Sequence, residues 1–202
     1  MKYLAIDTSG DLIVIAHSEG KNAVRYLNGC NTKHSITLMP YVEECMDELK
    51  LALVDLDFIA VVVGPGSFTG IRIGVATAKA LCFASGKPIL PLTSFDLLAY
   101  SDNAPLKSVC LIDANHGNYY VCAYQNGEAQ TKPAFMTEEQ IKSEFSHFQA
   151  VASHKLENFD NFVANLPSGL TNAVNALNKN CTHHENCYPL YVKRSQAEEE
   201  LC

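Results

Sequence analysis

The part of the sequence best suited to chemistry is a glycine-rich stretch that directly follows an apolar run at residues 58–63. Residues 64–74 read Gly-Pro-Gly-Ser-Phe-Thr-Gly-Ile-Arg-Ile-Gly and hold four of the chain's eleven glycines. Glycine concentrates where the backbone must pass close to another group or adopt positive φ. Here a buried strand is followed by such a turn and then by a helix of small residues. This order of elements occurs in many phosphate-binding sites and in many tight helix–sheet junctions.

The spacing excludes two common phosphate-binding loops. A Walker A loop requires Lys and then Ser or Thr after its last glycine, but isoleucine and arginine follow Gly70. A dinucleotide-binding loop that starts at Gly64 requires glycine where Thr69 stands. The alternative is a stiff strand-to-helix connection, in which Pro65 fixes one φ angle and Ser67 or Thr69 caps the helix.

A second strand–turn sequence, Asp7-Thr8-Ser9, has residue types that suit a metal–phosphate site. An aspartate at the end of a strand can hold a metal-bound water while hydroxyls and amides approach the phosphate. The alternative is an Asx or Ser/Thr turn that satisfies its own backbone. A complete site of this type needs a second aspartate-led glycine loop and a glycine pair, whereas Asp113 precedes only Gly117 and the chain contains no Gly-Gly. We therefore expect no independent ATP hydrolysis.

Other groupings of catalytic or metal-binding residue types are sparse. Cys181, His183, His184 and Cys187 form one local cluster, but their spacing matches no standard zinc site, so we expect no metal. The chain has neither a His-Glu-x-x-His motif nor a Gly-x-Ser-x-Gly elbow. A metallopeptidase or serine hydrolase is therefore not expected.

Composition indicates a globular protein that does not bind nucleic acid by itself. The chain has 202 residues, of which 48% are hydrophobic and 18% charged, and its formal net charge is −7. An autonomous RNA-binding protein usually carries a basic stripe, whereas this chain offers only Lys193-Arg194 and scattered lysines. No apolar run approaches the roughly 20 residues that span a bilayer, and no leader precedes the first strand. We therefore expect a cytoplasmic protein with no membrane partner. In such a protein Cys30, Cys45, Cys82, Cys110 and Cys122 are expected to be buried and to pack as small hydrophobic side chains.

Hydrophobic periodicity predicts an α/β chain in two half-domains. The first, residues 1–102, is expected to contain strands at 3–7, 11–17, 22–28, 58–63 and 88–92 and helices at 35–50, 71–85 and 94–100. The second, residues 103–202, is expected to contain strands at 108–113, 119–125 and 148–152 and a helix at 137–145. Residues 165–187 give no clear pattern. This order predicts mixed sheets flanked by helices.

The residue types of the glycine-rich stretch point to a protein family more specifically than the spacing of its glycines does. Residues 64–74 strongly resemble the signature of the TsaB (YeaZ) family, the non-catalytic members of the bacterial machinery for tRNA threonylcarbamoyl-adenosine synthesis. The resemblance runs end to end and is strongest over residues 1–100. Further segments that resemble the family are residues 4–9, 34–40, 112–114 and 188–192.

The resemblance implies an actin/Hsp70/sugar-kinase-like (ASKHA, RNase H-like) fold with two half-domains and no complete active site. It implies a subunit that binds the transferase TsaD and helps to recruit the ATPase TsaE, with tRNA contacted only indirectly. It also implies a homodimer when the chain is alone, no intrinsic cofactor, and a candidate nucleotide at the surface shared with TsaD. The competing hypothesis is a free-standing ATPase or small-molecule kinase that uses Asp7, Asp113 and the glycine loop.

Two helices and the glycine loop form the candidate partner surface. The helices at 35–50 and 75–84 have wider apolar stripes than one sheet contact needs, so they can meet a second subunit. The alternative is that the core absorbs this surface; the resemblance favours the partner. Asp7, Thr8 and Ser9 would be a vestigial phosphate loop, and Arg72 could bind a carboxylate or phosphate. The candidate interface and loop residues are Gly64, Pro65, Gly66, Ser67, Phe68, Thr69, Gly70, Arg72, Gly74, Met39, Val42, Met46, Val75, Ala78, Lys79 and Cys82.

Several positions depart from the family pattern. Asn115 and Asn118 stand where the family usually has arginine and glutamate, and Lys193 replaces a common arginine. These changes put in doubt any anion contact made through those positions. The transferase TsaD carries a metal-binding His-x-x-x-His, which corresponds to positions near Ser94 and Leu98, so neither ligand is present here.

Overall fold

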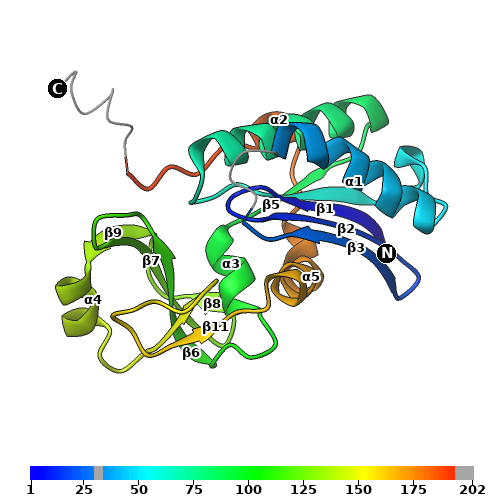
Figure 1. Ribbon diagram of the computed structural model, residues 1–202. Helices are drawn as coiled ribbons and strands as arrows, with labels where there is room; N and C mark the ends of the chain where they lie inside the picture. The colour runs from blue at the N-terminus through cyan, green and yellow to red at the C-terminus, as the bar shows by residue number, and fades with distance from the viewer. Residues whose placement is uncertain (30–33, 194–202) are drawn as a thin grey trace, which may run out of the picture.

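The computed structural model describes residues 1–29 and 34–193, which form two mixed β-sheets with helices around them (Figure 1). The first sheet has the order β3-β2-β1-β4-β5; β1, β2 and β3 pair antiparallel, whereas β4 and β5 run parallel to β1. This arrangement confirms the predicted actin/Hsp70/sugar-kinase-like class. Its strands are β1 (Lys2–Asp7), β2 (Leu12–Ser18), β3 (Lys21–Leu27), β4 (Phe58–Val62) and β5 (Ile89–Leu92).

Helices cover both faces of the first sheet because side chains alternate between the faces of a strand. Leu4 and Ile6 of β1 pack against α1 (His34–Glu48) and α2 (Phe68–Ser85), which lie side by side in Figure 1. Tyr3 and Ala5 face the other way, toward α5 (Leu166–Leu177). The boundary proposed at residue 102 falls between the two sheets, but the chain returns across it to place α5 on the first sheet.

The second sheet has the order β11-β10-β6-β7-β8, with β9 paired to β7. The helix α4 (Glu138–Glu144) packs on one face, and α3 (Ser94–Ala99) packs on the other, between the two sheets. Phe95 and Leu98 of α3 are buried against Cys110 and Cys122 of this sheet. The strands are β6 (Lys107–Asp113), β7 (Asn118–Gln125), β8 (Glu128–Ala129), β9 (Ala134–Thr137), β10 (Gln149–Ala152) and β11 (Asn161–Val163).

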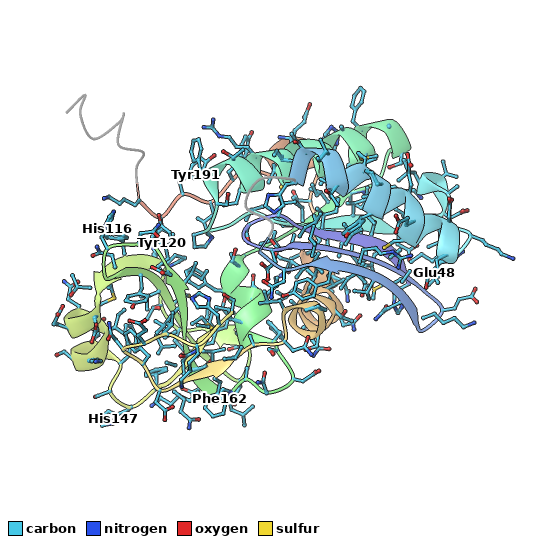
Figure 2. The ribbon with its side chains drawn as sticks, viewed as in Figure 1. Glu48, His116, Tyr120, His147, Phe162 and Tyr191 are labelled. Atoms are coloured by element: carbon cyan, nitrogen blue, oxygen red, sulfur yellow. The ribbon has the colours of Figure 1, made fainter. Side chains whose placement is uncertain are left out.

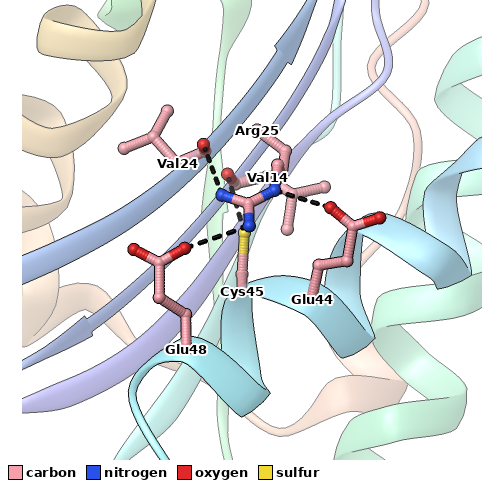
Figure 3. A network of polar contacts seen from close by, with 6 residues as sticks. All are labelled: Val14, Val24, Arg25, Glu44, Cys45 and Glu48. Atoms are coloured by element: carbon pink, nitrogen blue, oxygen red, sulfur yellow. Dashed lines mark hydrogen bonds and ion pairs between the residues drawn. The ribbon is translucent and has the colours of Figure 1, made fainter.

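Charged contacts fix α1 to the edge strand β3 (Figure 3). The guanidinium of Arg25 donates to Glu44 Oε2 at 2.7 Å, to Glu48 Oε2 at 3.0 Å and to the carbonyl of Val24 at 3.1 Å. Arg25 lies on the same face of β3 as Ala23 and Leu27, which is the face that α1 covers, and its side chain is 31% exposed. Glu44 and Glu48 therefore help to hold α1 on this edge of the sheet.

The C-terminal segment returns to the first half of the chain. Thr182 forms a two-hydrogen-bond bridge with Ile89, Cys187 is buried in the first core, and the amide of Leu190 donates to the carbonyl of Val63 at 2.7 Å. Three single-turn 3₁₀ helices complete the described structure: Leu53–Asp55, Asn178–Asn180 and His184–Asn186. Residues 188–192 lie along the edge of α2 without forming a strand.

The predicted cysteine environments are confirmed for four residues. Cys45, Cys82, Cys110 and Cys122 are buried free thiols, while Cys30 lies outside the described residues. Among the described helices, none combines the length and apolarity that a membrane crossing requires.

Candidate functional site

The glycine loop packs directly on the turn that follows β1. A Cβ atom at Gly66 or Gly70 would overlap the carbonyl oxygens of Ser9 and Thr8, so only glycine fits at these positions. The amide of Ser67 donates to the Ser9 carbonyl at 2.6 Å, and Thr8 Oγ1 donates to the Gly70 carbonyl at 2.7 Å. The glycines thus serve a tight junction inside this chain, which was one of the two alternatives that the sequence left open.

The loop leads into α2 through a side-chain cap. Ser67 is the N-cap residue, and its Oγ accepts a hydrogen bond from the Gly70 amide at 3.3 Å. Thr69, the other predicted cap, lies inside the helix and is exposed. Gly74 lies one turn further on, where a Cβ would overlap Thr8 Oγ1. The first two turns of α2 are therefore packed closely against the turn that follows β1.

A cleft of about 610 Å³ opens between the two halves of the molecule. Its lining comes from the turn after β1, the glycine loop, α3, and the loops after β6 and β10. Three carboxylates line it, those of Asp7, Asp11 and Asp113, and its described lining includes neither Lys nor Arg. Burial raises the pKa of Asp7 to about 6, because removal from water disfavours the charged form.

The Asp7-Thr8-Ser9 turn uses its polar groups internally. Asp7 Oδ1 accepts a hydrogen bond from the Ser9 amide at 2.7 Å, which forms the Asx turn predicted as the alternative to a phosphate loop. The hydroxyl of Ser9 accepts a hydrogen bond from Ser94 Oγ at 3.0 Å. All three residues of the turn are buried. Ser94 and Leu98 of α3 both line the cleft, and neither offers a metal-binding nitrogen or carboxylate.

The loop after β6 faces the same cleft from the second half. Asn115, His116 and Gly117 all have positive φ, and the Asn115 amide donates to Asp113 Oδ1 at 2.7 Å. Asp113 itself is exposed, and His154 lines the cleft from the loop after β10. The two aspartates that the competing kinase hypothesis requires therefore do share one cleft.

Arg72 is held by one aromatic ring from its own helix, α2, and by a second ring from the distant C-terminal segment. Its guanidinium lies 3.8 Å from the centre of the Phe68 ring, and its Nε donates to the Tyr191 hydroxyl at 3.0 Å. Beside it lies a small pocket of about 180 Å³, which Tyr120 and Lys193 also line; Figure 2 labels Tyr120 and Tyr191. The sequence singled out Arg72 but gave no signal that Tyr191, which lies 119 residues away, would contact it.

The predicted interface residues differ in their burial. Val42, Met46, Val75, Ala78 and Cys82 are buried between the first sheet and its two helices. The expectation that these five side chains face a partner is corrected here, because the chain's own core covers them. Met39, Phe68, Thr69 and Arg72 are exposed, whereas Gly64 and Pro65 of the loop and Gly70 and Gly74 of α2 are buried. Lys79 is partly buried and donates to the Cys187 carbonyl at 3.1 Å.

The side of α1 and α2 that faces away from the sheet remains apolar in part. On α1, Ile36 and Met39 are 69% and 39% exposed, and on α2, Phe83 is 76% exposed. In the middle of α2, the small residues Ala76 and Ala80 are also exposed. We call these five residues the α1–α2 face. The small residues allow another helix to approach closely, and the exposed side chains of Ile36, Met39 and Phe83 offer apolar area.

Comparisons of the sequence with known proteins identify relatives of this chain. The family model described as tRNA N6-adenosine threonylcarbamoyltransferase (TsaD) matches residues 28–157, which is more than half of the chain. The chain is 28% identical over 150 residues to the tRNA threonylcarbamoyladenosine biosynthesis protein TsaB of Escherichia coli, covering 73% of this chain and 65% of that protein. It is 35% identical over 127 residues to the TsaB protein of Bacillus subtilis, covering 62% and 56% of the two chains. The matched regions thus span between about half and two thirds of these relatives.

Solved structures of similar proteins match a larger share of the chain than the sequence comparisons do. The structure titled YeaZ from Pseudomonas aeruginosa superposes with a TM-score of 0.75 at 25% identity. The superposition covers 94% of this chain and 99% of that one. A second structure, of a protein from the same organism described as similar to peptidase YEAZ, gives a TM-score of 0.76 at 25% identity, with coverages of 95% and 99%.

Proposed function

Because the chain belongs to the TsaB (YeaZ) family, we propose that it is a non-catalytic partner subunit in the cytoplasmic synthesis of threonylcarbamoyl-adenosine in tRNA. In this function it binds the transferase TsaD and helps to recruit the ATPase TsaE, and it meets tRNA only through the complex. The observation that carries the proposal is the α1–α2 face, an apolar surface on two adjacent helices that the described chain does not cover.

A partner of related fold suits this face. The TsaD family model matches residues 28–157, a range that includes both α1 and α2. A transferase of that family therefore has counterparts of the two helices. Two copies of this chain can pair the face isologously, and a related transferase can replace one copy with its own counterpart. The same surface thus supports a homodimer alone and a heterodimer in the presence of TsaD.

The cleft between the halves supports a non-catalytic role. Nucleotide phosphates bind best to cations and to free backbone amides or hydroxyls. The described cleft lining offers three carboxylates and no Lys or Arg, and the hydroxyls of Thr8 and Ser9 are engaged within the chain. A nucleotide in the assembled complex is better placed near the mouth of the glycine loop, where Arg72 is exposed beside a pocket.

Light scattering coupled to size-exclusion chromatography tests the proposal. The pure chain is expected to be a homodimer, and addition of the TsaD protein of the same organism is expected to convert it to a one-to-one heterodimer. Ala80→Arg places a long charged side chain on the α1–α2 face and should abolish both species. Ala176→Arg is the matched control, because Ala176 is exposed on α5, on the opposite side of the first sheet. A monomer that ignores TsaD, or an Ala80→Arg variant that pairs normally, would refute the proposal.

A free-standing ATPase or small-molecule kinase is the second candidate, favoured by the shared cleft of Asp7 and Asp113. It requires Mg²⁺ to offset the repulsion between these carboxylates and the phosphates. Titration calorimetry with Mg-ATP on the isolated chain separates the two functions. Tight binding that Asp7→Asn weakens would support the enzyme, and the scaffold predicts no measurable binding in this cleft.

A further inference from the structure

We propose that His183, His184 and Glu185 form a zinc-binding site at the C-terminal end of α2. Their ligand atoms, two imidazole nitrogens and a carboxylate oxygen, all lie within 4.8 Å of one another. His183 Nδ1 is 3.5 Å from Glu185 Oε2. Two ligands of a tetrahedral zinc ion, each about 2.0–2.1 Å from the metal, are about 3.3 Å apart. This pair is therefore already near the spacing that coordination requires.

The backbone that carries the three ligands is fixed on both sides. Before them, Thr182 exchanges two hydrogen bonds with Ile89 at the edge of the first sheet, at 2.9 and 2.8 Å. After them, Cys187 is buried in the first core. Lys79 of α2 donates to the carbonyls of Glu185 and Cys187, at 3.4 and 3.1 Å. A segment anchored in this way loses little conformational freedom when its side chains bind an ion.

The side chains themselves are positioned but open to solvent. The ring of His184 lies against the edge of Phe83, with ring centres 5.9 Å apart, and the two histidine rings are 4.3 Å apart. The side chains of His183 and Glu185 are 62% and 78% exposed. Small rotations can therefore close the set around an ion, and solvent supplies the remaining ligands.

The donor set selects the metal. Imidazole nitrogen suits zinc and its neighbours in the transition series, whereas Mg²⁺ and Ca²⁺ prefer oxygen ligands throughout. The two flanking cysteines do not complete the set. Cys187 is buried in the core, and the thiol of Cys181 donates to the Asn178 carbonyl at 3.1 Å.

The test is zinc titration of the full chain at pH 7.5, after removal of metals by a chelator. We expect one Zn²⁺ bound per chain in the micromolar range and no binding of Mg²⁺ at the same concentrations. His183→Gln and Glu185→Gln should each weaken zinc binding at least tenfold. His147→Gln is the matched control, because His147 is an exposed histidine in the other half of the molecule (Figure 2). Cys181→Ser should bind zinc normally.

The site is refuted if the wild-type chain binds no zinc below millimolar concentration, or if His183→Gln binds it as tightly as His147→Gln does. Zinc binding that Cys181→Ser removes would also refute it, since the ligands would then be thiolates. Thermal melting of His183→Gln, Glu185→Gln and His147→Gln without metal should match the wild type, because these three side chains are exposed. This confirms that any lost binding reflects a lost ligand.

Discussion

Gly70 and Thr8 are in contact across the junction between the glycine loop and the first strand. Thr8 Oγ1 donates a hydrogen bond to the Gly70 carbonyl at 2.7 Å, and a Cβ at Gly70 would overlap the Thr8 carbonyl oxygen. The overlapping atom belongs to the backbone of the buried turn that follows the central strand β1, so it cannot move aside as a side chain would. The glycine signature is therefore explained within this chain by backbone packing.

Gly70→Ala should strongly destabilise the protein. The added methyl group forces α2 away from β1, and overpacking of this kind costs about 3 kcal/mol or more in the free energy of unfolding. Urea denaturation followed by circular dichroism measures the change. Gly10→Ala is the control, since a Cβ at Gly10 meets nothing within 4 Å. Equal stability of the two variants would show that the junction is looser than described.

The buried carboxyl of Asp7 should make stability depend on pH. Burial raises the pKa of Asp7 from 3.8 to about 6. Well below pH 3.8 the carboxyl is protonated in both the folded and the unfolded state, so burial carries no ionic cost. Between pH 3.8 and about 6 mainly the unfolded chain ionises, so stability falls as the pH rises, and well above pH 6 the loss is constant at about 3 kcal/mol.

Asp7→Asn should therefore stabilise the chain, and more so at pH 8 than at pH 4.5. The asparagine oxygen can still accept the hydrogen bond from the Ser9 amide. Urea denaturation at both pH values gives the difference, and Asp160→Asn controls for removal of one negative charge at an exposed position. If Asp7→Asn has the same effect at both pH values, Asp7 is not held in a dry environment.

Most of the fold could be predicted because its elements have regular hydrophobic periods. The helix predicted at 35–50 is observed at His34–Glu48, and the strand predicted at 58–63 at Phe58–Val62. The strands β8, β9 and β11 were missed because two to four residues are too few to show a period. The helix α5 was missed because its asparagines resemble loop residues. In the structure Asn165 caps the helix and Asn172 donates to the Tyr100 carbonyl.

The site was predictable only in its local parts. The sequence identified the glycine loop and the Asp7 turn separately, but their contact depends on the parallel pairing of β1 with β4. The stack of Arg72 on Phe68 is local, at helical spacing, whereas the Tyr191 hydroxyl reaches Arg72 only because the C-terminal segment returns along α2. Long-range returns of this kind leave no periodic signal in a single sequence.

Buried thiols of the second sheet should resist modification. Burial raises the pKa of Cys110 well above its usual range and that of Cys122 to about 11. Alkylation requires the thiolate and access of the reagent, and both are lacking here. Mass spectrometry after brief iodoacetamide treatment should show both residues modified at least a hundredfold more slowly in the native chain than in urea. Rapid native labelling of Cys110 would mean that α3 does not stay on this sheet.

Two methionines of α1 should separate folding from partner binding. Met46 is 5% exposed in the first core, so Met46→Ala should cost about 2–5 kcal/mol of unfolding free energy through lost burial and the cavity left behind. Met39 is 39% exposed on the α1–α2 face, so Met39→Ala should change stability by less than about 0.5 kcal/mol. Denaturation and light scattering on both variants give the two readouts. Met39→Ala should weaken pairing while leaving the monomer's stability intact, and a Met39→Ala chain that pairs like the wild type would place the partner surface elsewhere.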